Sequence, residues 1–202
     1  ADDGADLMDA LGFESMHVVG MSMGGMISQA LTINHPTKVR SLCSVMSNTG
    51  DRRNGGISLK LIRAMGLPKP PGSKETAVED SLALWRHISG DHFDADETRQ
   101  RAEAGLERSW CPDGVMRQAA AIGGSDDRTV GLRNVKAPSL VIHGLKDLLV
   151  APSGGTATAA AIPGSRLLMF PDMGHNLPEP RQDEMVAAIV RNTLRSSVGD
   201  GV

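Results

Sequence analysis

The chain has 202 residues, enough for one domain that carries an inserted segment. Hydrophobic residues make up 40% and charged residues 22% of the sequence, which is typical of a globular protein rather than a disordered one. A net charge of −3 and an aromatic content of 2% argue against a surface that binds nucleic acid or an anionic membrane.

The sequence shows no targeting or anchoring signal. No stretch approaches the roughly 18 apolar residues that a membrane span needs, and no secretory leader is visible, so we expect a cytoplasmic protein. Because the first residue is Ala1 and not Met, we expect the natural start to lie upstream. The two cysteines, Cys43 and Cys111, form no C-x-x-C pattern, and we expect no metal site and no disulfide framework.

In residues 1–50, two kinds of apolar pattern alternate along the chain. Short continuous apolar runs predict strands that are buried on both faces, and runs with a period of about 3.6 residues predict helices. The predicted elements are a helix over residues 3–11, a strand over 16–20, a helix over 23–34 and a strand over 39–46. On the second helix we expect Met23, Ile27, Ala30 and Leu31 to form the buried stripe.

Residues 51–133 carry no convincing strand pattern. Turn-rich sequences such as "GLPKPPGSK" and "SGDHFDAD" separate helical stretches over residues 57–65, 76–88, 96–110 and 114–122. We therefore predict a helical cap inserted into a core that comprises residues 1–50 and 134–202.

Strand patterns return after this insert. The predicted elements are a strand over residues 139–143, a helix over 152–162, a strand over 166–170 and a helix over 180–196. Buried strands that alternate with helices predict an α/β protein, with a mostly parallel sheet covered by helices on both faces. On the last helix we expect a core face of Met185, Val186, Ile189, Val190 and Leu194.

The stretch Gly20-Met21-Ser22-Met23-Gly24 lies between a predicted strand and a predicted helix. A dinucleotide-binding loop would need glycine in place of Ser22 and a carboxylate at the end of the next strand, which here reads "VMSN". A G-x-S-x-G turn instead holds its serine in a strained conformation, and small residues at Gly20 and Gly24 let strand and helix approach closely. The pattern favours Ser22 as a nucleophile.

A serine hydroxyl needs a base to accept its proton and an acid to orient that base. Of the six histidines, His175 follows the last predicted strand in a glycine-containing loop, where α/β sheets place catalytic groups. His143 ends a predicted strand, and we expect a structural role for it.

The candidate acid is Asp147, which follows the strand before that of His175. Asp172 and Asp51 compete with it, because each also lies after a predicted strand. The order Ser22, Asp147, His175 along the chain is the nucleophile–acid–base order of one hydrolase fold and differs from that of the trypsin and subtilisin types.

These segments resemble the α/β-hydrolase superfamily, and more narrowly bacterial esterases of the aclacinomycin-methylesterase-like group. The resemblance is carried by "HVVGMSMGGMISQALTINHPTKVRSL", "VKAPSLVIHGLKDLLVAPSGG", "AIPGSRLLMFPDMGHNLP" and the last helix. It implies the α/β-hydrolase fold with Ser22 as nucleophile, Asp147 as acid and His175 as base. It also implies that the backbone N–H of Met23 is an oxyanion-hole donor.

The sequence departs from that family in what precedes the serine turn. The fold normally begins with about four further strands, and one of their loops supplies another oxyanion donor. We expect the chain to lack these strands. The strand over residues 16–20 would then be an uncovered sheet edge through which the chain self-associates.

The resemblance implies a serine hydrolase that cleaves a small-molecule carboxylic ester through an acyl-enzyme, with no cofactor or metal. We expect Met21, Trp85 and Leu148 to line the substrate pocket. Two alternatives stay open: an inactive member of the fold that acts only in binding, and a cofactor-free haloperoxidase or acyltransferase that uses the same three residues.

Overall fold

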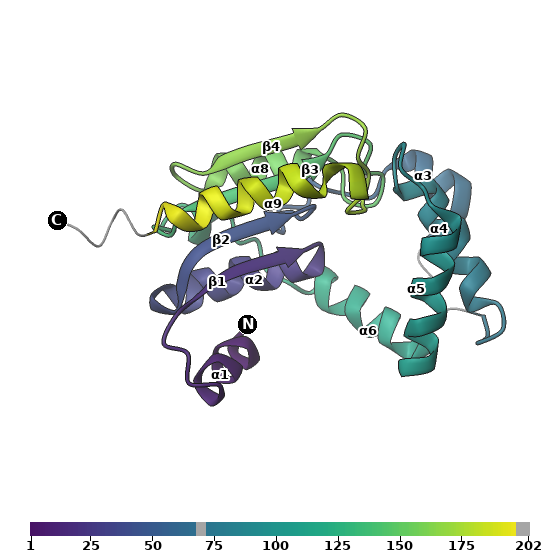
Figure 1. The fold of residues 1–202 in the computed structure, drawn as a ribbon, viewed down its shortest axis with the longest axis horizontal. Coiled ribbons are helices and arrows are strands. Elements are labelled where there is room, and N and C mark those ends of the chain that lie inside the picture. Colours follow the sequence, from purple (N-terminus) through teal and green to yellow (C-terminus); the bar gives the residue numbers. More distant parts are fainter. Residues whose placement is uncertain (68–71, 197–202) are drawn as a thin grey trace.

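The computed structural model of the protein describes residues 1–67 and 72–196. Its sheet contains the strands β1 (Met16–Met21), β2 (Val39–Val45), β3 (Ser139–Gly144) and β4 (Arg166–Phe170). They pair in the order β1-β2-β3-β4, and every pair is parallel. The carboxyl ends of all these strands therefore meet at one edge of the sheet (Figure 1).

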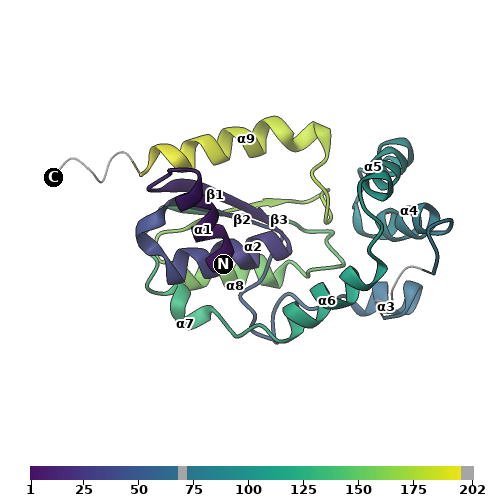
Figure 2. The ribbon, with the colours of Figure 1, turned by 90° about the horizontal axis from the view of Figure 1, so that it is seen from below.

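Helices cover both faces of this sheet, as Figure 2 shows. On one face α9 (Glu179–Leu194) packs against β2 and β3, and on the other face lie α2 (Met23–Asn34) and α8 (Ser153–Ala161). The remaining helices are α1 (Asp2–Ala10), η1 (Pro36–Lys38), α3 (Leu59–Met65), α4 (Ala77–Ile88), α5 (Ala95–Arg108), α6 (Pro112–Gly123) and α7 (Thr129–Leu132). The predicted α/β architecture is confirmed, and the predicted elements begin and end within a few residues of the observed ones.

Apolar clusters on the two faces hold the layers together. Ile142 and Phe170 share the cluster that α9 completes with Met185, whereas Leu42 packs with Ile162 on the opposite face. Side chains alternate between the faces of a strand, so a strand that is apolar on both sides is held by both helical layers. Each fully buried side chain of this size contributes about 1.5–3 kcal/mol.

The buried face of α2 differs from the predicted one. Ser28, Gln29 and Thr32 are buried, whereas Ile27 is 45% exposed. The Ser28 and Thr32 hydroxyls donate to carbonyls one turn earlier in the helix, and Gln29 Nε2 donates to Ser44 Oγ at 3.0 Å. Leu31 is buried as expected, and Met23 and Ala30 are partly buried. Hydrogen-bonded polar groups can be buried at low cost, so the prediction from apolar spacing is wrong for Ile27 and missed the buried polar residues.

The prediction for the last helix is wrong in part. Met185 is buried and Ile189 packs against the same cluster, as expected. Val186, Val190 and Leu194 are 57%, 50% and 61% exposed. The helix contacts β2 and β3 through its Met185 side, and this leaves the neighbouring apolar stripe on the outside.

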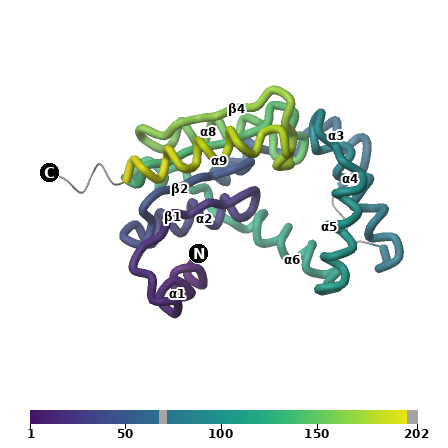
Figure 3. Tube along the Cα trace, in the orientation of Figure 1, coloured from purple at the N-terminus to yellow at the C-terminus, as the bar shows by residue number. Residues whose placement is uncertain are grey.

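The described part of residues 51–133 is mainly helical, and most of its helices lie at one end of the sheet. Figure 1 shows α3, α4 and α5 beyond the arrowheads of the strands. The trace in Figure 3 leaves the sheet after β2 and returns through α6, and Figure 2 shows α7 on the α8 side of the sheet. The short helix α7 packs against α2 and α8. No helix in the described ranges is long and apolar enough to cross a membrane.

Candidate active site

Ser22 lies on the turn between β1 and α2. Its φ of 55° and ψ of −121° put a non-glycine residue in a region that costs on the order of 1–3 kcal/mol. Its N–H donates to Val45 O at 2.8 Å, and its carbonyl accepts the N–H of Gly25 at 2.9 Å. The turn is thus fixed between two strands and a helix, and the Ser22 side chain is half-buried at the carboxyl edge of the sheet.

The glycines around Ser22 play different roles from those expected. A Cβ atom on Gly20 would overlap Gly24 O and Ser28 Oγ, so this position requires glycine. A Cβ on Gly24 would meet no described atom within 4 Å, whereas one on Gly25 would lie 2.6 Å from Ser47 Cβ. The close approach of β1, β2 and α2 therefore rests on Gly20 and Gly25, and the expectation for Gly24 is wrong.

Asp147 and His175 are hydrogen-bonded to each other in a buried position. His175 Nδ1 donates to Asp147 Oδ2 at 2.7 Å, and the two residues are 3% and 2% exposed. The other carboxylate oxygen, Oδ1, accepts the N–H groups of Leu149 and Val150, both at 2.9 Å. Both oxygens of Asp147 are thereby fixed, and one of them orients the His175 ring.

The Asp147 carboxylate is held in its charged form. Burial raises the pKa of this carboxyl, but the nearby His143 ring, the hydrogen bond to His175 and the Val150 N–H together outweigh burial, and its pKa lies below the usual 3.8. A charged acceptor makes the bond to His175 stronger than a neutral one would.

His143 belongs to the same cluster, a contact that the sequence analysis missed. Its side chain is fully buried, and Nε2 donates to Val150 O at 2.9 Å while lying 3.5 Å from Asp147 Oδ2. Its Nδ1 has no hydrogen-bond partner in the described part of the chain. The four-residue spacing between His143 and Asp147 at the end of a buried strand is the signal that could have indicated it.

The competing acids are engaged elsewhere. Asp172 Oδ2 accepts from Arg181 Nη2 at 2.7 Å and from His92 Nε2 at 2.8 Å. Asp51 accepts hydrogen bonds from a neighbouring arginine, which lowers the pKa of its carboxyl to about 2. Neither carboxylate bonds to His175, so Asp147 is the acid that contacts the ring.

Ser22 and His175 reach the same edge of the sheet from different strands. Ser22 follows β1 and His175 follows β4, and Met21 packs against the cluster that contains Met173. Because Nδ1 of His175 is bonded to Asp147, Nε2 is the ring nitrogen left for a second partner. No hydrogen bond joins Ser22 Oγ to His175 within the described residues, so this contact stays a prediction.

Met23 is the first residue of α2. The N–H groups in the first turn of a helix have no acceptor within the helix, and they lie at the positive end of its dipole. The Met23 N–H is therefore placed beside Ser22 with the properties that an oxyanion donor needs.

The three predicted pocket residues have different surroundings. Trp85, on α4, lines a pocket of about 180 Å³ between α4 and α5, whose wall includes Asn176. Met21 packs against an apolar cluster at the sheet. Leu148 is half-buried, and its carbonyl accepts the N–H of Ser58 at 2.9 Å. Of the three, Trp85 alone lines this pocket.

A larger hollow has Met23 among its lining residues. It measures about 500 Å³ and runs along the outer face of α2 toward the end of α6, and neither Ser22 nor His175 lines it. Across residues 1–67 and 72–196, no three His, Cys, Asp or Glu side chains gather to hold a metal ion.

The sequence matches a family model and several named proteins. The model, described as "alpha/beta hydrolase fold", matches residues 1–181. Rhodomycin D methylesterase DauP of Streptomyces sp. (strain C5) is 26% identical over 218 residues, with 98% of this chain and 73% of the relative aligned. The 2-hydroxymuconate semialdehyde hydrolase of Pseudomonas putida is 29% identical over 191 residues, covering 93% and 65% of the two chains.

Solved structures extend the likeness to three dimensions. The esterase EaEST from Exiguobacterium antarcticum superposes with a TM-score of 0.70 and 20% sequence identity. The match covers 95% of this chain and 71% of that one. At this identity the similarity concerns the arrangement of the elements.

Proposed function

Because the chain belongs to the α/β-hydrolase family, we propose that it is a serine hydrolase that cleaves carboxylic esters. The observation that carries the proposal is the buried 2.7 Å hydrogen bond between Asp147 and His175. It lies at the sheet edge where Ser22 occupies its strained turn. Relatives named as a methylesterase and a semialdehyde hydrolase support hydrolysis as the reaction class.

In the proposed mechanism His175 Nε2 accepts the proton of Ser22 Oγ while that oxygen attacks the ester carbonyl carbon. Asp147 stabilises the imidazolium that forms, and the Met23 N–H donates to the developing oxyanion. The tetrahedral intermediate collapses, the bond to the alcohol oxygen breaks, and His175 returns the proton to the leaving alcohol. Water, deprotonated by His175, then hydrolyses the acyl-enzyme. No step requires a cofactor or a metal.

We further propose that residues 51–133 act as a cap on the core of residues 1–50 and 134–202. The helices α3 to α5 stand at the carboxyl edge of the sheet, which is the edge that carries Ser22 and His175 (Figure 1). The pocket beside Trp85 includes Asn176, the neighbour of His175, and suits part of a small ester.

The test is Ser22→Ala, with Ser109→Ala as the matched control at an exposed serine. We expect Ser22→Ala to lower the hydrolysis of short p-nitrophenyl esters by at least about 10³-fold and to abolish labelling by a fluorophosphonate. Ser109→Ala should retain both the ester hydrolysis and the fluorophosphonate labelling of the wild type. Turnover that is independent of Ser22 would contradict the proposal.

The same assay addresses the alternatives. A folded wild-type chain that neither labels nor turns over esters would indicate a binding protein. Acyl transfer to an added alcohol in preference to water would indicate an acyltransferase that uses the same residues.

A further inference from the structure

The segment of residues 88–93, which joins α4 to α5, is hydrogen-bonded along the loop that carries His175. The N–H of His175 donates to Ile88 O at 2.5 Å, and the N–H of Asp91 donates to Asp172 O at 2.9 Å. Between these two bonds, Gly90 and Met173 form an antiparallel bridge. The 88–93 segment thus pairs with the base loop as one strand pairs with another.

Side chains add to this pairing. Asn176 Nδ2 donates to His92 O at 3.0 Å. His92 Nε2 donates to Asp172 Oδ2 at 2.8 Å, and Arg181, on α9, donates to the same carboxylate. The carboxylate of Asp172 therefore links the 88–93 segment, the base loop and the last helix.

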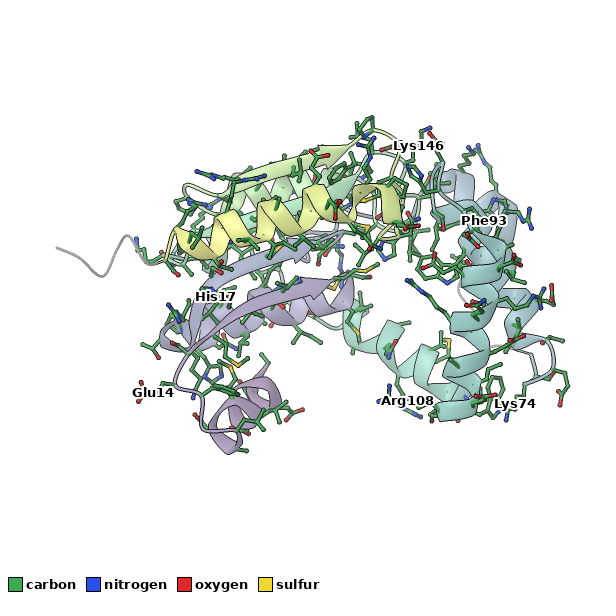
Figure 4. The ribbon with its side chains drawn as sticks, viewed as in Figure 1. Glu14, His17, Lys74, Phe93, Arg108 and Lys146 are labelled. Carbon is green, nitrogen blue, oxygen red and sulfur yellow. The ribbon has the colours of Figure 1, made fainter. Side chains whose placement is uncertain are left out.

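A second ionic contact lies beside the acid. Lys146, which precedes Asp147, pairs with Asp91 of the 88–93 segment. Figure 4 shows Lys146 at the edge of the sheet that faces the helical region, and Phe93 lies in that region. The segment is thus attached to both loops that supply the Asp147–His175 pair.

The pairing leaves no room for a side chain at its centre. A Cβ atom on Gly90 would lie 2.5 Å from Asp172 O and 2.7 Å from Gly174 N, both of them backbone atoms of the base loop. The φ of Gly90 is +66°, which also favours glycine. Backbone meets backbone here, so a shift of the segment displaces the loop that holds His175.

We infer that the 88–93 segment positions His175, and that Asp172 and His92 are positioning residues that hold the segment in place. The inference rests on the proposed function, because it assigns His175 the role of base. Hydrogen bonds from Arg181 and His92 keep the pKa of the Asp172 carboxyl well below its usual range, so this link carries a charge at neutral pH. On this inference the helical insert fixes the position of His175 in addition to covering the site.

The kinetic test uses Asp172→Asn and Gly90→Ala. Each should lower kcat by about 10- to 100-fold with little change in KM, because a shift of about 1 Å in a catalytic group has that effect while substrate contacts remain. Glu79→Gln is the control, since it removes an exposed ion pair of 2.9 Å to Arg99 between the same two helices. It should leave kcat unchanged.

His92 supplies a rescue test. His92→Ala should show the same loss of kcat as Asp172→Asn. His92→Gln should retain most of the wild-type kcat, because the glutamine amide nitrogen can replace Nε2 as a donor to Asp172. Equal losses in His92→Ala and His92→Gln would contradict the assigned hydrogen bond.

A readout besides activity separates this inference from the proposed function. In Asp172→Asn we expect the amide of His175 to exchange with solvent about tenfold faster or more, and the low-field proton signal of His175 Nδ1 to shift. Ester turnover that does not depend on Ser22 would contradict the proposed function. If the changes at His175 still occur in Asp172→Asn, the positioning role of the segment stands. If Asp172→Asn and Gly90→Ala alter neither kcat nor the exchange of this amide, the positioning role is overturned.

Discussion

Ser22 keeps its unfavourable backbone conformation because the atoms around it leave no alternative. Its N–H and carbonyl are both bonded, and the turn is enclosed by Gly20 on the strand side and Gly25 on the helix side. Packing at glycines therefore compensates for the strain at the residue that we propose as nucleophile.

We predict opposite outcomes for two neighbouring glycines. Gly20→Ala should lower the free energy of unfolding by about 1–3 kcal/mol, because its Cβ would overlap Gly24 O and Ser28 Oγ. Gly24→Ala should be neutral or raise it by up to about 1 kcal/mol, because the site is open and alanine favours the helix. Urea unfolding at neutral pH measures both, and equal losses in the two variants would show that the serine turn packs differently.

The charge on Asp147 predicts a pH-dependent stability. Its pKa is lowered in the folded protein, so its contribution to the free energy of unfolding is complete above the unfolded-state value of 3.8 and is lost as the pH falls through the folded-state pKa. In urea unfolding, the difference between wild type and Asp147→Asn should be constant above about pH 5 and should shrink below it. A difference that grows with acid would contradict the lowered pKa.

At the residue scale the sequence predicted the contact between Asp147 and His175 but missed the contacts around it. Ser22, Asp147 and His175 were identified because the carboxyl ends of parallel strands share an edge, so loops distant in sequence come together. The contact of His143 with Asp147 depends on the local turn after β3, which residue spacing does not determine. The role of Gly25 depends on the position of Ser47, which the tertiary structure determines.

Among the elements, α7 joins the helical insert to the core through one buried arginine. Arg128, which directly precedes α7, donates to Gln29 Oε1 and to Asn48 O, both at 3.1 Å. Its burial lowers the pKa of the guanidinium, and no described carboxylate forms an ion pair with it. The hydrogen bonds to Gln29 and Asn48 thus satisfy a buried cation and fix the return of the chain toward β3.

We predict that Arg128→Ala lowers the free energy of unfolding by about 2–4 kcal/mol, because Gln29 Oε1 and Asn48 O lose their donor in a buried site. Arg133→Ala, at an exposed arginine next to the same helix, is the matched control and should change it by no more than about 0.5 kcal/mol. Thermal or urea unfolding measures both. If Arg128→Ala lowers the free energy of unfolding no more than Arg133→Ala does, the hydrogen bonds of Arg128 to Gln29 and Asn48 do not stabilise the fold.

Elements with a clear period were predicted well and short ones were not. The strands and longer helices have apolar spacing that identifies them, whereas the four residues of α7 are too few to show a period. The buried side of α2 was misassigned in part because polar residues are buried there through hydrogen bonds. Ser28 and Thr32 bond within the helix, and Gln29 bonds to Ser44 on the neighbouring strand β2.

At the scale of the whole molecule, β1 and α9 both expose apolar side chains to solvent. β1 is at an edge of the sheet, and Val19 on it is 53% exposed. Val186 and Val190 of α9 are exposed as well. An open strand edge beside apolar side chains favours association, and we propose that a second copy of the chain covers this surface.

We predict that Val186→Glu combined with Val190→Lys reduces this association. Light scattering across a range of concentrations should show a mass that rises with concentration for the wild type and a monomer for the double variant. Val130→Glu, at a residue that is 68% exposed on α7, is the control and should behave like the wild type. A monomeric wild type at high concentration would contradict the prediction.

The pairing of Ile88 with His175 restricts how this chain can be recombined with its relatives. Residues 88–93 belong to the insert by sequence and to the core by hydrogen bonding. A chimera joined near residues 51 and 133 would import a foreign partner for the His175 backbone together with the new helices. Joints that keep residues 88–93 native would allow the helical walls around Trp85 to be exchanged while the proposed base keeps its native support.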